Sequence, residues 1–125
     1  MMSTRLGNIN LFVHDVQKAR DFYVQALNLV ENRERSKAPS FVLLQAGDCT
    51  ITLQDAAAPG ASFAKTESIE LGFEVDDIAK VQKQLTEAGG KVSEQQQMGW
   101  GSGFDAFDLD NHRLTIYKMR NENNA

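Results

Sequence analysis

The chain lacks three features that would each place it in a particular class of protein. It has a single cysteine, Cys49, which excludes an intramolecular disulfide and is typical of proteins from a reducing cytoplasm. The net charge is −4 and lysine and arginine do not cluster, which disfavours a nucleic-acid or acidic membrane partner. No apolar run approaches the roughly 20 residues that span a bilayer. We therefore expect a cytoplasmic protein that binds neither nucleic acid nor membranes.

What the chain does have is an internal repeat. Two octets, Asn8-Ile-Asn-Leu-Phe-Val-His-Asp15 and Glu70-Leu-Gly-Phe-Glu-Val-Asp-Asp77, alternate like strands, end on an aspartate and run into helical patterns. The second octet ends 62 residues after the first (77 − 15), in a chain of 125 residues. We expect one domain, 1–125, of two like modules at about 5–57 and 66–119. Two such modules facing each other would form a cleft for a ligand.

Each module is predicted to run strand–helix–strand–strand–strand, which gives an α+β fold with helices on the outer face. The apolar spacing predicts helices over 16–27 and 78–88, with Asp15 and Asp76 or Asp77 as N-caps and Gly89-Gly90 as a left-handed stop. A linker of small residues, Ala56–Ala61, separates the modules. The predicted strands are 7–13, 30–35, 41–45, 49–54, 69–75, 92–97, 104–108 and 113–118.

One face of the predicted sheets is polar. Apolar residues such as Leu11 and Ile116 alternate with polar ones, so we expect the helices to cover the apolar face. If the two modules curve toward each other, the polar faces line a cup. The residues on this face are Asn8, Asn10, Phe12, Thr50, Thr52, Gln54, Glu70, Glu74, Arg113, Thr115 and Tyr117.

Aromatic residues give this face a second kind of contact. Trp100 lies between Gly99 and Gly101, in a segment predicted to be a glycine-rich loop. A flat side chain on such a loop can stack on a planar ligand, or it can cover the edge of the core. Phe12, Phe104 and Tyr117 are expected to complete an apolar wall, although Phe12 fits the core equally well.

The repeat and its motifs resemble the glyoxalase / bleomycin-resistance / extradiol-dioxygenase superfamily, also called vicinal oxygen chelate proteins. The resemblance covers about residues 5–118 and implies paired βαβββ modules with curved, mostly antiparallel sheets, a site in each sheet and commonly a homodimer. Some members sequester flat aromatic antibiotics. The segments that carry the resemblance are 11–23, 73–77, Gly99-Trp-Gly101 and Phe107-Asp-Leu-Asp-Asn-His112.

The resemblance also implies where a divalent metal would be held in the family's enzymes, on the first and last strands of the modules. Those places, usually His and often Glu, correspond here to Asn8, Thr52, Glu70 and Thr115. Neutral amide and hydroxyl oxygens hold transition metals poorly, and one carboxylate does not supply the three protein ligands of catalytic zinc. With His14 and His112 expected in solvated loops, we predict no metal and no cofactor, and a divalent ion only if Glu70 rebuilds a site.

The sequence therefore favours a protein that binds or sequesters a small, partly aromatic molecule in the cup. Glu70 is the one candidate catalytic residue, as a general base, although a hydrogen-bonded or solvated carboxylate explains it as well. Two alternatives remain open: a metal-dependent lyase, isomerase or dioxygenase of the same superfamily, and an interaction module with an occluded cup. The predicted ligand-binding residues are Asn8, Asn10, Phe12, Thr52, Glu70, Trp100, Phe104, Thr115 and Tyr117.

Overall fold

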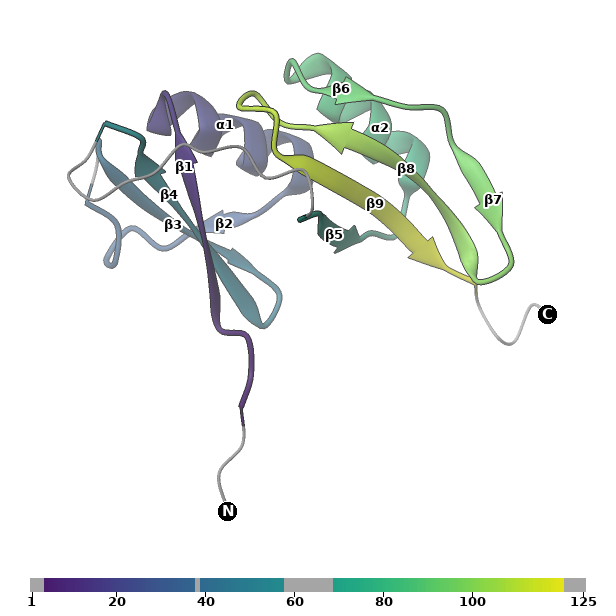
Figure 1. Ribbon diagram of the computed structural model, residues 1–125, viewed down its shortest axis with the longest axis horizontal. Coiled ribbons are helices and arrows are strands. Elements are labelled where there is room, and N and C mark those ends of the chain that lie inside the picture. The colour runs from purple at the N-terminus through teal and green to yellow at the C-terminus, as the bar shows by residue number, and fades with distance from the viewer. Residues whose placement is uncertain (1–3, 38, 58–68, 121–125) are drawn as a thin grey trace. The chain divides into compact units, whose positions relative to one another are not determined.

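A computed structural model describes residues 4–37, 39–57 and 69–120. The chain divides into two compact units, Met1–Ala64 and Lys65–Ala125, and each contains one helix and one sheet (Figure 1). Residues 58–61 of the predicted linker lie outside the described residues. Neither helix of the described ranges is long and apolar enough to cross a membrane.

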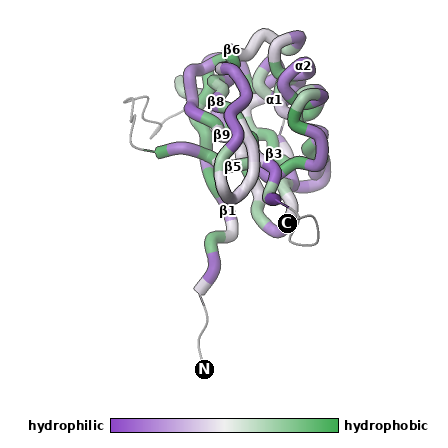
Figure 2. The backbone as a smooth tube through the Cα atoms, turned by 90° about the vertical axis from the view of Figure 1, so that its right-hand side faces the viewer, coloured by the Kyte–Doolittle hydropathy of each residue, from purple (hydrophilic) through white to green (hydrophobic). Residues whose placement is uncertain are grey.

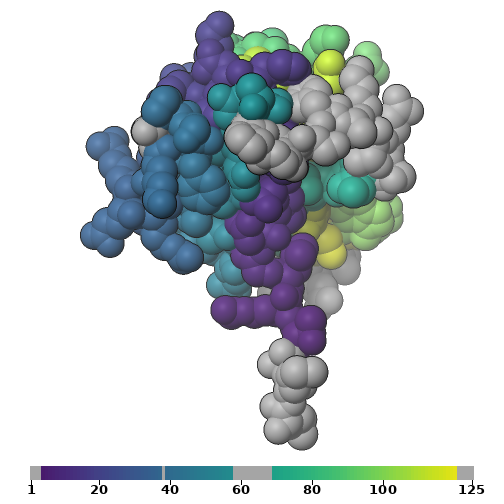
Figure 3. All heavy atoms as spheres, turned by 60° about the vertical axis from the view of Figure 1, so that its left-hand side comes forward, coloured from purple at the N-terminus to yellow at the C-terminus, as the bar shows by residue number. Residues whose placement is uncertain are grey.

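The first unit is a four-stranded mixed sheet with one helix. In chain order its elements are β1 Asn8–Val13, α1 Val16–Leu27, β2 Val30–Glu31, β3 Phe41–Ala46 and β4 Cys49–Asp55. The spatial order is β1-β4-β3-β2, with β1 parallel to β4 and the other neighbours antiparallel. The edge strand β1, purple in Figure 3, lies at the surface of this unit. Helix α1 packs against β3 and β4.

The second unit repeats this arrangement. Its elements are β5 Leu71–Glu74, α2 Ile78–Glu87, β6 Lys91–Val92, β7 Gln96–Met98, β8 Gly101–Phe107 and β9 Arg113–Met119. The order is β5-β9-β8-β6, and β7 also pairs with β8. The first strand is again parallel to the last, β5 to β9. Helix α2 packs against β6, β8 and β9. The predicted α+β fold of two βαβββ modules is thus confirmed.

The two helices begin in the same way. The carboxylates of Asp15 and Asp77 accept hydrogen bonds from the backbone N–H groups of Lys18 and Lys80, each at 3.0 Å. Each bond satisfies one of the amides that a helix start leaves without a partner. The ends differ, because α1 stops at Asn28 with φ 57° and α2 stops before Gly89 with φ 96°. Both are left-handed stops.

Each helix buries one stripe against its own sheet. Apolar and polar residues alternate along the helices and strands in Figure 2. In α1, Phe22 and Tyr23 are almost fully buried, with their rings edge to face at 5.2 Å. In α2 the buried residues are Ile78, Val81 and Leu85. Burial of each large apolar side chain, on these stripes and on the strands that they cover, stabilises the fold by about 1.5–3 kcal/mol.

Four predicted strands differ from the observed ones by more than one residue. The strand predicted over 69–75 is shortened to β5, Leu71–Glu74. The strand predicted over 30–35 ends at Glu31, because a turn at 33–35 is held by Asn32, whose side-chain oxygen accepts from the Arg35 amide at 3.2 Å. The strand predicted over 92–97 is split into β6 and β7. The strand predicted over 104–108 begins earlier, at Gly101, and Asp108 belongs to the following turn.

The early start of β8 depends on its glycines. A Cβ added to Gly101 would overlap the backbone carbonyl oxygen of Lys118, and one added to Gly103 would lie 2.6 Å from the carbonyl oxygen of Ile116. Strand β8 therefore approaches β9 more closely than any side chain permits at these two positions.

Candidate functional site

We call the sheet face opposite the helix the open face of each unit. The strand register assigns every residue to a face, because directly paired residues point to the same side. In the first unit the open face has three rows across β1, β4 and β3. These rows are Asn8–Thr50–Gln45, Asn10–Thr52–Leu43 and Phe12–Gln54–Phe41.

Uncharged polar side chains form a hydrogen-bonded network in these rows. The Asn10 side-chain oxygen accepts from Asn8 Nδ2 and Gln54 Nε2, both at 3.1 Å, and from the hydroxyl of Thr52. The Thr50 hydroxyl donates to Asn8 Oδ1 at 2.6 Å. The predicted residues Asn8, Asn10 and Thr52 are thus brought together, and Gln54 joins them.

The polar centre of this face has an apolar border. Phe12 and Phe41 are half-buried on either side of Gln54, and Leu43 is buried beside Thr52. Phe12 was predicted to lie either on the polar face or in the core, and it lies on the open face. Phe41 and Leu43 were not among the predicted ligand-binding residues, although their alternation with Val42 and Leu44 would have placed them on one face.

In the second unit the corresponding face is charged. Arg113 Nε lies 2.6 Å from Glu70 Oε2, and Arg113 Nη2 lies 3.7 Å from Asp105 Oδ2. The Thr115 hydroxyl donates to Asp105 Oδ1 at 3.3 Å. Glu70 and Thr115 are therefore joined through Arg113 and Asp105. The carboxylate of Glu70 is engaged in an ion pair, which supports its reading as a partnered surface group over that of a general base.

An aromatic pair lies at the other end of this open face. Trp100 occupies the turn between β7 and β8, and its ring centroid is 5.8 Å from that of Tyr117, with the planes at 77°. This is the edge-to-face geometry that aromatic rings prefer. Tyr117 lies between Gly103 and Glu74 in its row, and 44% of Trp100 is exposed. Part of both rings is thus left accessible on a sheet face.

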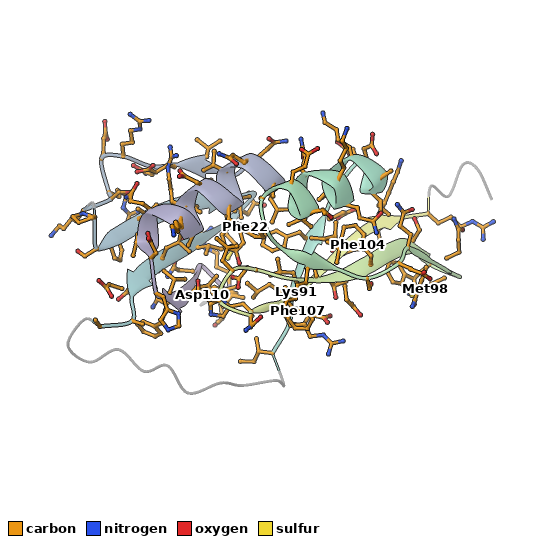
Figure 4. All side chains as sticks on the ribbon, turned by 90° about the horizontal axis from the view of Figure 1, so that it is seen from above. Phe22, Lys91, Met98, Phe104, Phe107 and Asp110 are labelled. Atoms are coloured by element: carbon orange, nitrogen blue, oxygen red, sulfur yellow. The ribbon has the colours of Figure 1, made fainter. Side chains whose placement is uncertain are left out.

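Phe104 does not belong to this surface. It pairs with Ile116 on the helix side of the sheet and is only 3% exposed. Figure 4 shows Phe104 between α2 and the sheet, whereas Phe107 lies on the other side. The predicted apolar wall therefore loses Phe104 to the core, because the register of β8 places residues 104 and 106 inward and 103, 105 and 107 outward.

The four positions at which the resemblance implies metal ligands, Asn8, Thr52, Glu70 and Thr115, carry neutral groups and one paired carboxylate. Asn8 Nδ2 donates to Thr52 Oγ1 at 3.4 Å in the first unit, and Glu70 is paired with Arg113 in the second. Within the described ranges no group of three or more His, Cys, Asp or Glu side chains could hold an ion. Neutral oxygens and an arginine-paired carboxylate do not fit the donor set of a catalytic zinc site.

A shallow pocket of about 330 Å³ lies away from the predicted residues, lined by Gln17, Arg20, Glu31, Arg33 and Ser36. Its central Arg20 is already engaged, with Nε 2.8 Å from Glu31 and Nη1 2.7 Å from Asp21. We therefore do not include this pocket in the candidate site.

His112 was expected to be solvated but is tied to a turn. Its Nδ1 lies 2.7 Å from Asp108 Oδ2, and Asp108 Oδ1 accepts from the backbone amides of Asp110 and His112 at 2.9 and 2.8 Å. Burial alone would lower the pKa of His112. The hydrogen bond that Asp108 accepts from the His112 ring and the negative charges of Asp108 and Asp110 together outweigh that effect and raise the pKa above its usual 6.5. His14, by contrast, is exposed.

This pair predicts a pH-dependent contribution to stability. Because the pKa of His112 is raised on folding, its stabilisation is fully present below pH 6.5 and is lost as the pH rises through the folded-state pKa. We expect His112→Gln to cost about 1 kcal/mol of unfolding free energy at pH 5.5 and less at pH 8.5. Urea denaturation at both pH values measures this, with His14→Gln as control. An equal cost at the two pH values would contradict it.

The comparisons with known proteins agree with the observed fold. A model of the glyoxalase/bleomycin resistance protein/dioxygenase superfamily matches residues 5–116. No curated protein sequence matches the chain. Similar solved structures are a glyoxalase/bleomycin resistance protein/dioxygenase family enzyme from Burkholderia phytofirmans PsJN and a lactoylglutathione lyase from Agrobacterium tumefaciens.

The two structures are distant in sequence but close in fold. The Burkholderia protein has a TM-score of 0.82 and 19% identity, over 94% of this chain and 100% of that one. The Agrobacterium lyase has a TM-score of 0.67 and 15% identity, over 93% and 94%. At such identities the likeness concerns the fold, while the family model covers most of the sequence. The chain therefore belongs to the glyoxalase/bleomycin resistance protein/dioxygenase superfamily.

Proposed function

We propose that this protein binds a small, partly aromatic molecule on the open faces of its sheets, without a metal ion. The observation that carries the proposal is the edge-to-face pair of Trp100 and Tyr117 on an exposed sheet face. Exposed rings on a sheet face offer the flat apolar contact on which a planar ligand can stack. In the second unit, Trp100 and Tyr117 provide stacking and Thr115 a hydrogen bond; in the first unit, Asn8, Asn10 and Thr52 provide hydrogen bonds.

We propose binding without a metal ion because of the donor atoms that these side chains offer. A ligand group that approaches Asn8, Thr52 or Thr115 meets neutral oxygens and amide N–H groups, which suit hydrogen bonding better than coordination of a transition metal. The ion pair of Glu70 with Arg113 removes the one anionic donor of the set. The homodimer, the cytoplasmic location and a cup shared by both faces stay predictions.

Fluorescence offers a direct test, because Trp100 is the only tryptophan. We expect saturable quenching or a spectral shift of its emission with at least one member of a library of planar aromatic compounds. Tyr117→Leu should weaken that ligand about three- to tenfold, the value of one aromatic contact. The control Phe107→Leu changes an exposed aromatic residue on the same face and should leave the affinity unchanged. Emission that responds to no planar compound would contradict the proposal.

The second candidate function is a metal-dependent lyase, isomerase or dioxygenase, and it is favoured by family membership and by the carboxylate of Glu70 at a family metal position. Metal analysis of the purified protein separates the two candidates. A stoichiometric divalent ion that is lost in Glu70→Gln would overturn the metal-free proposal. A protein without such an ion, and with unchanged ligand affinity in Glu70→Gln, would support it.

A further inference from the structure

The first unit presents a polar pair framed by aromatic rings. In the last row of its open face, Gln54 on β4 lies between Phe12 on β1 and Phe41 on β3. Directly paired residues place their Cβ atoms about 5 Å apart, so both rings flank the Gln54 amide. Asn10 follows in the next row and is bonded to Gln54 at 3.1 Å.

The network fixes which atoms of this pair remain available. The Asn10 oxygen is occupied by donors from Asn8, Thr52 and Gln54, so Asn10 is oriented with Nδ2 away from the network. Gln54 uses Nε2 to reach Asn10, which leaves its Oε1 as an acceptor. Among the described residues, no partner is found for Asn10 Nδ2 or Gln54 Oε1. A donor on Asn10 and an acceptor on Gln54 are thus left on two hydrogen-bonded neighbours of an accessible surface.

The surroundings of this pair carry little charge. None of the residues in the three rows is ionisable, and one charged residue, the exposed Lys37, bridges to Phe41 at the end of the last row, whereas the second unit has Glu70, Glu74, Asp105 and Arg113 on its open face. A cationic ligand group would lose hydration against the first face and gain no counter-charge, and an anionic group would meet only Lys37 at the border. A neutral polar group loses far less, and the adjacent donor and acceptor replace its hydrogen bonds to water.

We propose that the open face of the first unit binds a neutral, planar amide edge, with carbonyl and N–H on the same side, as in a lactam or cyclic imide. Asn10 Nδ2 donates to the ligand carbonyl, and the ligand N–H donates to Gln54 Oε1. Phe12 and Phe41 pack against the planar group. This inference rests on the proposed function and names the chemical class of its ligand.

Two isosteric probes test the inference on the full chain. 2-Quinolinone carries the amide edge, and coumarin has the same shape with a ring oxygen in place of the N–H. We expect 2-quinolinone to shift the side-chain amide NMR signals of Asn10 and Gln54, and to bind at least about tenfold more tightly than coumarin, whose ring oxygen would oppose an acceptor. Gln54→Met should abolish this difference. Gln25→Met, the same change on the exposed side of α1, should keep it.

The possible outcomes distinguish a failure of this inference from a failure of the proposed function. Equal affinity for the two probes, a preference that survives Gln54→Met, or unchanged Asn10 and Gln54 signals would overturn the amide-edge assignment. Failure of both probes to bind would overturn it as well. In each of these cases a response of Trp100 to the planar library would leave the proposed function standing, and a silent Trp100 would remove both.

Discussion

Gly101→Ala is expected to cost about 2–3 kcal/mol of unfolding free energy, although it adds a single methyl group. The new Cβ would overlap the carbonyl oxygen of Lys118 and lie 3.1 Å from the backbone nitrogen of Arg120. Both contacts are with backbone atoms, so the overlap can be relieved only if β8 separates from β9. The cost in unfolding free energy should be in the range found for other overpacked sites. The Arg120 amide also donates to the Trp100 carbonyl at 2.7 Å. Separation should therefore change Trp100 emission too.

Gly99→Ala is the matched control for this prediction. Gly99 lies in the same hairpin, and no atom of the described residues comes within 4 Å of a Cβ built there. Its substitution should change stability by no more than about 0.5 kcal/mol. Urea denaturation measures the difference in unfolding free energy between the two variants. Gly103→Ala should lose about as much stability as Gly101→Ala. Equal midpoints for Gly99→Ala and Gly101→Ala would show that the strands are not closely packed at this point.

Asp108→Ala is expected to have the second large effect, a loss of about 2–4 kcal/mol. Its side chain is 2% exposed and serves three donors, the backbone amides of Asp110 and His112 and the His112 ring. Removal leaves these donors without the acceptor at the turn between β8 and β9, and each lost charged hydrogen bond costs about 1.5–3 kcal/mol before relaxation. Chemical denaturation near pH 6 measures the loss.

Two variants give this prediction its controls. Asp76→Ala removes an exposed carboxylate from the same unit and should have little effect. Asp108→Asn keeps an oxygen acceptor for the backbone amides but removes the charge, so it should lie between wild type and Asp108→Ala. The interpretation fails if Asp108→Ala is as stable as Asp76→Ala.

The parts of the fold that sequence could predict are those determined by local chemistry. Both helices begin where an aspartate can cap them, at Asp15 and Asp77, and both bury residues at three- and four-residue spacing. The repeat also located equivalent strand positions. Thr52 pairs with Asn10 and Thr115 pairs with Gly72, which lies 62 residues after Asn10 (72 − 10).

The parts that sequence could not predict depend on contacts with distant residues. Gly101 and Gly103 have no strand propensity, and only their close approach to β9 makes them part of β8. The inward position of Phe104 follows from its pairing with Ile116, and a shift of one residue would have placed it outward. Sequence left two interpretations open for Glu70, a general base and a hydrogen-bonded carboxylate, because its partner Arg113 is 43 residues away.

The pairing of first with last strand has a consequence for how the chain folds during synthesis. The bond between Thr50 and Asn8 spans 42 residues, and the one between Arg113 and Glu70 spans 43. Such separations in sequence raise the entropic cost of loop closure. During synthesis, β1 can pair with β4 only after β4 has left the ribosome. Each half then forms as a unit, with the first able to assemble while the second is still being translated. A truncation before β4 would leave β1 without its parallel partner, and one before β9 would do the same to β5. Unpaired strand edges of this kind promote aggregation.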